Sequence, residues 1–272
     1  MNGSIIHLMC VEVYGKYKKG RSMRAQKVVV ITGGGRGIGA AAAKLFAKEG
    51  YAVCINYKSN SETANTLAQG IIAEGGRCIT VQADVSNEAD VIRMFSTVDK
   101  ELGAISVLVN NAGILKQQSR LEEMTADRIN EILFNNVTSY FICSREAVKR
   151  MSTRHGGNGG VIVNVSSGAA RTGSPNEYID YAASKGAIDT LTKGLSLEVA
   201  AEGIRVNCVR PGLIHTDMHA DGGEPERIER LKSKIPLQRG GEPEEVAEAI
   251  YWLASEKSSF STGNYLDLSG GL

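Results

Sequence analysis

An apolar, β-branched segment runs directly into a glycine-dense loop, and this junction narrows the possible folds more than any other part of the sequence. Residues 27–32 (KVVVIT) form a continuous apolar run, which is typical of a strand buried on both faces of a parallel sheet. The glycine-rich loop 33–39 follows at once, and residues 38–49 repeat apolar side chains at helical spacing up to Gly50. We therefore predict a strand, a tight turn and a helix in succession.

The same alternation continues along the chain. We expect strands at 52–56, 78–82, 107–110, 161–165, 205–209 and 265–268, and helices at 61–74, 87–102, 125–152, around Tyr181 and at 244–254. Strands separated by helices at this spacing are typical of βαβ units. With the first strand, they predict a single doubly wound α/β domain over residues 27–272, with about seven parallel strands and helices on both faces. We expect residues 1–26 to be a disordered extension or a wrongly assigned start, with Met23 as a candidate first residue.

Composition excludes several classes of protein. A formal net charge of +1 over 272 residues indicates neither a nucleic acid nor a membrane surface as a partner. The five cysteines are scattered and form no CxxC or Cys/His cluster, so we expect reduced thiols in a cytoplasmic protein. No apolar run approaches the roughly 20 residues that span a bilayer. His215 and His219 lack a third ligand at suitable spacing, so no metal site is predicted.

The glycine loop is suited to phosphate binding. Gly33, Gly37 and Gly39 stand between a predicted strand and a helix start. Without Cβ atoms the backbone can approach a pyrophosphate, and the helix N-terminus stabilises its negative charge. The loop therefore predicts a dinucleotide cofactor.

The end of the second predicted strand indicates which dinucleotide. It reads Asn56-Tyr57-Lys58-Ser59, without the acidic residue that an NAD-selective enzyme usually places there. Lys58, the Ser59 hydroxyl and Arg36 of the glycine loop could instead bind a 2′-phosphate through charge-assisted hydrogen bonds. We therefore predict NADP(H) in preference to NAD(H). The missing carboxylate also argues against a methyltransferase of similar topology.

Tyr181 and Lys185 are four residues apart, so a helix places both on one face. An isolated tyrosine has a pKa of about 10, which makes it a poor acid or base at neutral pH. A neighbouring ammonium favours the phenolate and is expected to lower that pKa toward the working range. We predict that Tyr181 exchanges a proton with a carbonyl or alcohol oxygen.

These motifs together resemble the short-chain dehydrogenase/reductase family from about residue 27 to residue 272. The matching segments are Thr32-Gly-Gly-Gly-Arg-Gly-Ile-Gly39, Ala83-Asp84-Val85, Asn110-Asn-Ala-Gly113, Asn135-Asn-Val-Thr138, the strand ending in Ser166-Ser167, Tyr181-x-x-x-Lys185 and Pro211-Gly-Leu-Ile214 with Thr216. The resemblance implies a Rossmann-type fold and an oxidoreductase that transfers hydride between NADP(H) and a small-molecule carbonyl or secondary alcohol. It also implies a homotetramer built on the helices at 125–152 and 181–201.

The resemblance further implies roles for individual residues. The catalytic residues are Asn136, Ser167, Tyr181 and Lys185. The cofactor contacts are Gly33, Arg36, Gly37, Ile38, Gly39, Asn56, Tyr57, Lys58, Ser59, Asp84, Val85, Asn111, Ala112, Gly113, Tyr181, Lys185, Pro211, Gly212, Ile214 and Thr216. Ser167 lies one residue farther from Tyr181 than in most relatives, so Ser166 and Ser174 stay open as the catalytic hydroxyl. Tyr178 is followed four residues later by Ala182, and we expect it to line the substrate pocket or to pack.

The substrate itself is left open. Residues 215–241 resemble the mobile lid that closes over substrate in this family. Among its members, the chain most resembles 3-oxoacyl-carrier-protein reductases and glucose-dehydrogenase-like enzymes. An acyl-carrier protein would require a basic patch for its acidic surface, and Lys232, Lys234 and Arg239 are candidates. A catalytically silent NADP(H)-binding or scaffold protein is the alternative from another class, although all four catalytic residues are present.

Overall fold

The structure, a computed structural model, describes residues 26–272, so the expectations for residues 1–25 lie outside the described residues. Seven parallel strands form one sheet in the order β3-β2-β1-β4-β5-β6-β7. The strands are β1 (Val28–Ile31), β2 (Ala52–Tyr57), β3 (Arg77–Gln82), β4 (Ile105–Asn110), β5 (Gly160–Val165), β6 (Ile204–Pro211) and β7 (Tyr265–Leu268). The predicted single-domain, doubly wound fold is confirmed.

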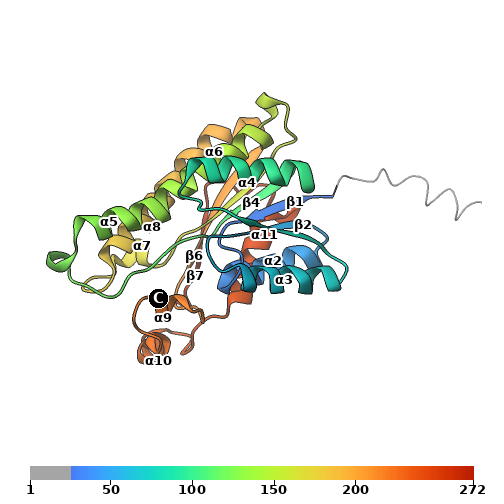
Figure 1. Ribbon diagram of the computed structural model, residues 1–272. Coiled ribbons are helices and arrows are strands. Elements are labelled where there is room, and N and C mark those ends of the chain that lie inside the picture. Colours follow the sequence, from blue (N-terminus) through green and yellow to red (C-terminus); the bar gives the residue numbers. More distant parts are fainter. Residues whose placement is uncertain (1–25) are drawn as a thin grey trace, which may run out of the picture.

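Helices cover both faces of the sheet (Figure 1). One layer contains α2 (Gly37–Lys48), α3 (Ser61–Ala73) and α11 (Pro243–Ala254), and the other contains α4 (Glu88–Glu101), α6 (Ser139–Met151) and α8 (Ile179–Val199). Strand β1 supplies both cores, because Val29 and Ile31 face the first layer while Val28 and Val30 face the second. This two-sided burial explains why the β1 sequence is apolar at every position.

The order of the strands reverses at β1, which pairs with β2 on one side and with β4 on the other. In open parallel sheets, ligands bind in the crevice beyond the carboxyl ends of the strands at such a reversal. The glycine loop after β1 and the Asn110–Gly113 segment after β4 therefore meet at this crevice.

The helix predicted over residues 125–152 is interrupted. The structure has α5 (Ala126–Leu133), a π-helical segment (Phe134–Thr138) and α6, so the expectation of one regular helix was wrong. The π segment carries Asn136, whose side chain is fully buried. Single π turns inside helices are frequent at functional sites.

The predicted insertion at 215–241 folds over the carboxyl ends of the strands. It contains α9 (Met218–Asp221), α10 (Arg227–Leu231) and a 3₁₀ turn at Lys232–Lys234, and Figure 1 shows α9 and α10 together beyond β6 and β7. The remaining short helix, α7 (Ala169–Thr172), follows β5. Further 3₁₀ turns are Leu121–Glu123, Thr153–His155, Ala200–Glu202 and Glu256–Ser258.

Candidate active site

The glycine loop is held in one conformation by its neighbours. Gly33 has a positive φ of 60°, and its N–H donates to the Asn56 side-chain oxygen at 3.2 Å. A Cβ on Gly39 would lie 2.6 Å from the amide nitrogen of Asn111, which donates to the carbonyls of Thr32 and Gly33 at 3.0 and 3.1 Å. The first turn of α2 is thereby fixed at the crevice, with its N-terminus available to an anion.

A cavity of about 330 Å³ opens beside this loop. Its lining includes most of the residues predicted to bind the cofactor: Gly33, Arg36, Gly37, Ile38, Asn56, Tyr57, Lys58, Ser59, Asp84, Val85, Asn111, Ala112, Gly113 and Thr216. The helix N-terminus and the glycine backbone beside it suit the phosphates of a dinucleotide. We call this space the nucleotide cavity.

The two cations of the nucleotide cavity are already paired with carboxylates. Lys58 lies 2.7 Å from Asp84, and Arg36 lies 2.5 Å from Asp221 and 3.7 Å from Asp217 of the lid. Burial opposes ionisation of Asp84, but hydrogen bonds from Lys58 and Ser86 outweigh it and lower the pKa of that carboxyl. The pairing of Arg36 could not be predicted from spacing, because 185 residues separate it from Asp221.

A second cavity of about 400 Å³ adjoins the first, since Ile38, Asn111, Thr216 and Met218 line both. The predicted residues that line it are Ile38, Asn111, Ser167, Tyr181, Lys185, Pro211, Gly212, Ile214 and Thr216. Much of the rest of its wall is apolar and comes from Leu115, Leu213 and Leu231. We call this space the substrate cavity. Of the predicted site residues, only Gly39 and Asn136 line neither cavity.

Tyr181 and Lys185 lie side by side on α8, as the spacing predicted. The Lys185 ammonium is 5.6 Å from the centre of the Tyr181 ring. It donates to the Val165 carbonyl at 2.8 Å and to the Tyr140 hydroxyl at 3.3 Å. Tyr140 comes from α6 and was not singled out from the sequence, although its hydroxyl also donates to the Val165 carbonyl at 2.9 Å.

Burial, and not the neighbouring lysine, dominates the ionisation of both groups. Burial raises the pKa of Tyr181 to about 12, and the Ser167 hydroxyl acts in the opposite direction. We expected Lys185 to lower the pKa of Tyr181, but in the chain without cofactor or substrate this pKa is raised. Burial also lowers the pKa of Lys185 to about 8, partly offset by Cys208 and Asp189. Both side chains pay a desolvation cost in their charged forms.

The serines that were left open differ in their contacts. Ser166 is buried, and its hydroxyl donates to the Lys185 carbonyl at 3.1 Å. Ser167 borders the substrate cavity, and its hydroxyl accepts from the Ala169 N–H at 3.1 Å. Ser174 also borders the cavity, in a left-handed backbone conformation with φ of 42°. Of these three serines, only Ser167 affects the pKa of Tyr181, which it lowers.

Two asparagines hold the centre of the site. Asn136 accepts from the Ile114 N–H at 2.8 Å and donates to the Ile114 carbonyl at 3.0 Å and to Ser184 at 3.2 Å. Asn110 donates to Asn164 at 2.9 Å, which ties β4 to β5. Asn136 therefore joins the loop after β4 to the helix that carries Tyr181.

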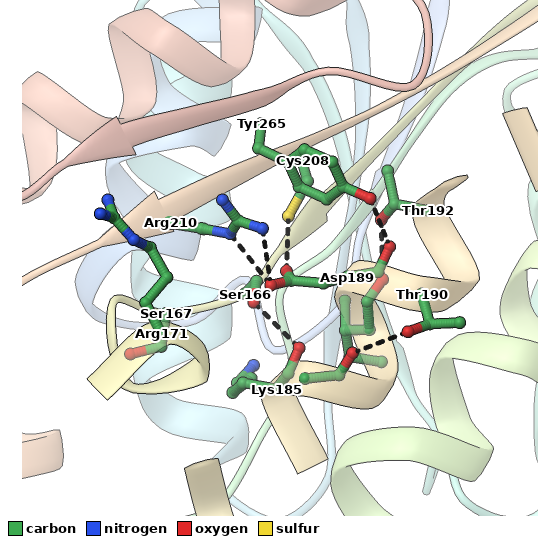
Figure 2. A network of polar contacts seen from close by, with 12 residues as sticks. Ser166, Ser167, Arg171, Lys185, Asp189, Thr190, Thr192, Cys208, Arg210 and Tyr265 are labelled. Atoms are coloured by element: carbon green, nitrogen blue, oxygen red, sulfur yellow. Dashed lines mark hydrogen bonds and ion pairs between the residues drawn. The ribbon is translucent and has the colours of Figure 1, made fainter. Parts of the chain in front are cut away.

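A polar network lies behind Lys185 (Figure 2). Asp189, one turn along α8, binds Arg210 of β6 at 2.8 Å, and the Arg210 guanidinium stacks on the Tyr265 ring at 4.1 Å. Asp267 of β7 lies 3.7 Å from Arg210 and 2.7 Å from Arg171, which borders the substrate cavity. This network was missed in the sequence, where the only signal was an acidic residue four positions after Lys185.

The lid is anchored to the substrate side. Tyr178 is buried, borders the substrate cavity and donates to the Gly222 carbonyl at 3.0 Å, so it is a wall residue as expected. Arg227 of α10 stacks on Tyr178 and pairs with Glu177 and with Glu224, the latter at 2.9 Å. These contacts attach residues 218–231 to the wall of the substrate cavity.

The candidate basic patch on the lid is largely neutralised. Lys232 pairs with Glu229 at 2.5 Å, and Arg239 pairs with Glu245 at 2.7 Å.

His219 borders the substrate cavity and contacts the Ile214 carbonyl at 3.0 Å. Within residues 26–272, no three His, Cys, Asp or Glu side chains gather in a set that could hold a metal ion. Every helix in this range is too short or too polar to cross a membrane.

Known proteins share these features. A family model described as Enoyl-(Acyl carrier protein) reductase matches residues 33–272. The oxidoreductase YgfF of Escherichia coli (strain K12), described as uncharacterized, is 59% identical over 244 residues, which cover 90% of this chain and 99% of that protein. Glucose 1-dehydrogenase 2 of Bacillus subtilis (strain 168) is 35% identical over 246 residues, covering 90% and 94%.

A solved structure agrees with the sequence matches. The crystal structure of a short chain dehydrogenase from Burkholderia cenocepacia J2315 in complex with NADP superposes with a TM-score of 0.82 at 34% identity, covering 91% of this chain and 98% of that chain. The region matched by the family model contains β2 to β7 and the residues that line both cavities. The chain therefore belongs to the short-chain dehydrogenase/reductase family of oxidoreductases.

Proposed function

We propose that this protein is an NADP(H)-dependent enzyme that interconverts a small-molecule carbonyl and the corresponding secondary alcohol, with Tyr181 as general acid and base. The observation that carries the proposal is the junction of the two cavities. Tyr181, Lys185 and Ser167 meet in the substrate cavity, which adjoins the nucleotide cavity at Thr216 and Ile38. A nicotinamide bound across this junction would supply or accept the hydride next to these side chains.

The residues of the nucleotide cavity fit such a cofactor. Gly33 and Gly37 adopt positive φ angles of 60° and 52°, which turn the loop so that the α2 N-terminus can face a pyrophosphate. Thr216, Pro211 and Gly212 border the substrate cavity where the nicotinamide end would lie. Lys185 reaches the same junction, because a Cβ on Gly113 would lie 3.7 Å from its ammonium nitrogen.

The protonation states suit carbonyl reduction. With a pKa raised to about 12 by burial, Tyr181 keeps its proton at neutral pH and can donate it to a carbonyl oxygen. Ser167 provides a second hydroxyl to that oxygen, and two donors stabilise negative charge better in the transition state than in the ground state. Lys185 beneath them holds its position through Val165 and Tyr140.

Preference for NADP(H) over NAD(H) is supported by charge. Arg36, Lys58 and Ser59 border one end of the nucleotide cavity, and β2 ends without a carboxylate of its own. A 2′-phosphate carries close to two negative charges at neutral pH and accepts several hydrogen bonds. The related Burkholderia cenocepacia enzyme was solved in complex with NADP, which is consistent with this preference.

We further propose a reducing, cytoplasmic setting and a homotetramer. The thiols of Cys54, Cys78, Cys143 and Cys208 are buried and unpaired, as in proteins of reducing compartments. Large apolar side chains are exposed where α5 and α6 meet and on α8: Phe134, Phe141 and Leu197, of which Leu197 is 70% exposed. Faces of this kind are typical of subunit interfaces.

Replacing Tyr181 with phenylalanine tests the catalytic assignment. Purified protein is assayed for NADPH and NADH oxidation with β-keto esters, quinones, diketones, aldehydes and sugar lactones. We expect turnover that prefers NADPH and falls by about 10² or more in Tyr181→Phe, because only the proton-donating hydroxyl is removed. Tyr251→Phe is the matched control, since that hydroxyl binds Glu49 at 3.0 Å and borders neither cavity.

The outcomes separate two classes of function. Near-normal turnover in Tyr181→Phe would contradict the role of this residue. Tight cofactor binding without turnover on any carbonyl would instead indicate a catalytically silent NADP(H)-binding protein. Binding is followed by nicotinamide fluorescence in both variants, so that lost activity is not mistaken for lost cofactor.

A further inference from the structure

Arg36 connects the glycine loop to the lid. Its guanidinium lies 2.5 Å from Asp221 at the end of α9 and 3.7 Å from Asp217 at the start. The three side chains are 55%, 44% and 71% exposed, so the pair lies at the rim of the nucleotide cavity and not in the core. Asp217 itself lines that cavity together with Arg36.

The Arg36–Asp221 contact joins the glycine loop of the nucleotide cavity to the helix α9, which borders the substrate cavity. The α9 helix carries Met218, whose sulfur lies 4.0 Å from the Tyr181 hydroxyl and which borders both cavities. A Cβ on Gly37, next to Arg36, would lie 3.2 Å from the Thr216 side chain. The first residues of the lid therefore rest directly on the glycine loop, and Arg36 is the charged part of that contact.

The same guanidinium is the one that a 2′-phosphate would need. Among the described residues that line the nucleotide cavity, the cations are Arg36 and Lys58, and each faces a carboxylate. Three carboxylates, Asp84, Asp217 and Asp221, therefore stand against two cations at this end. A phosphate that binds Arg36 in bidentate fashion has to replace the carboxylates of the lid.

We propose that Asp221, assisted by Asp217, sets the preference between NADPH and NADH by competing with the 2′-phosphate for Arg36. This inference rests on the proposed function. NADH lacks the 2′-phosphate and leaves the Arg36–Asp221 pair in place. NADPH takes Arg36 from the lid, so the pair lowers the affinity for NADPH alone.

Linkage makes the competition reciprocal. If the Arg36–Asp221 pair weakens binding of the 2′-phosphate, then bound 2′-phosphate weakens the attachment of α9 by the same factor. The attachment is modest, because half-exposed ion pairs contribute little and are screened by salt. The 2′-phosphate therefore displaces Asp221 from Arg36. As a result, α9 is held less firmly when NADPH is bound than when NADH is bound.

The test compares dissociation constants of NADPH and NADH in the full chain, measured by nicotinamide fluorescence. In Asp221→Asn we expect NADPH to bind about two- to fivefold more tightly and NADH to bind as in the parent. In Arg36→Gln we expect NADPH to lose about tenfold or more, and addition of Asp221→Asn should then change nothing. Glu229→Gln is the matched control, since it removes a lid charge that pairs with Lys232.

Hydrogen exchange of residues 217–222 gives a readout that does not depend on turnover. Adenosine 2′,5′-bisphosphate, which carries the 2′-phosphate without a nicotinamide, should speed exchange there, whereas AMP should not. Asp221→Asn should show the fast exchange without any ligand. If Asp221→Asn changed the dissociation constants of NADPH and NADH equally, with both cofactors still bound, the proposed competition would be wrong but the proposed function would stand. Failure of the parent to bind either cofactor would overturn both this inference and the proposed function.

Discussion

Lys185 and Tyr181 are both buried, and burial moves their pKa values in opposite directions, to about 8 and about 12. The residue types and their spacing could be predicted from the sequence, because a helix fixes which side chains share a face. The direction in which the pKa of Tyr181 shifts could not be predicted from the sequence. It depends on how completely the phenol is removed from water, which is decided by Met218 and other residues far away in the chain.

The burial of Lys185 predicts a pH-dependent stability. Its pKa is about 8 in the folded chain and 10.5 when exposed, so between these values the unfolded state binds more protons and stability rises with pH. We expect the free energy of unfolding of the parent, relative to Lys185→Met, to increase by about 3 kcal/mol from pH 7.5 to 10.5. Urea unfolding of both proteins across this range checks it.

The parent must be compared with the Lys185→Met variant because buried thiols titrate in the same pH range and lower the free energy of unfolding as pH rises. Burial raises the pKa of Cys143 and Cys208 to about 12, so these groups make the parent less stable as pH rises. Both thiols are present in parent and variant, so the contribution of Cys143 cancels in the difference, whereas Cys208 also responds to the charge of Lys185. Lys193→Met, at an exposed position of the same helix, should give a flat difference; a similar slope there would contradict the assignment.

At the scale of elements, periodicity located the strands and most helices to within a few residues. It could not reveal the π segment at Phe134–Thr138, because apolar spacing is nearly the same in α- and π-helical turns. The interruption is explained by tertiary contacts: Asn136 satisfies both backbone groups of Ile114 and binds Ser184. The attachment of the lid was equally hidden, since Arg227 pairs with Glu177, which is 50 residues away in the chain.

Asn136→Ala tests whether the π segment is held by these contacts. The substitution leaves the part-buried N–H and carbonyl of Ile114 without their partners and removes the buried contact with Ser184, so we expect a loss of about 1–3 kcal/mol in the free energy of unfolding. Denaturant titration measures it. Asn135→Ala is the neighbouring control, because that side chain contacts only the Glu131 carbonyl of its own helix and should cost clearly less. Equal losses would show that Asn136 has no special structural role.

At the scale of the whole molecule, the sequence predicted about seven parallel strands, whereas their order and its reversal at β1 come from the structure. Assembly is a different matter. The proposed interface rests on exposed apolar side chains, and one chain does not determine how many copies would cover them.

We expect charged substitutions on the proposed interface to lower the molar mass of the assembly. We expect the parent to elute as a tetramer, and a variant with Phe141→Glu and Leu197→Glu to dissociate, because an unpaired buried charge is costly at an apolar interface. Light scattering after gel filtration measures the mass. Ile72→Glu, at a position on α3 that is 53% exposed, should leave it unchanged. A monomeric parent would contradict the proposed assembly.

Asn56 limits how the cofactor preference of this molecule can change in evolution or by redesign. Its oxygen accepts from the Gly33 N–H, and its nitrogen donates to the Ala83 and Val81 carbonyls at 3.0 and 3.3 Å. An aspartate there would offer no donor and would set a carboxylate against two carbonyl oxygens. The ends of three strands depend on one amide, so a ribose-binding carboxylate is accessible only farther along, at Tyr57 or Lys58.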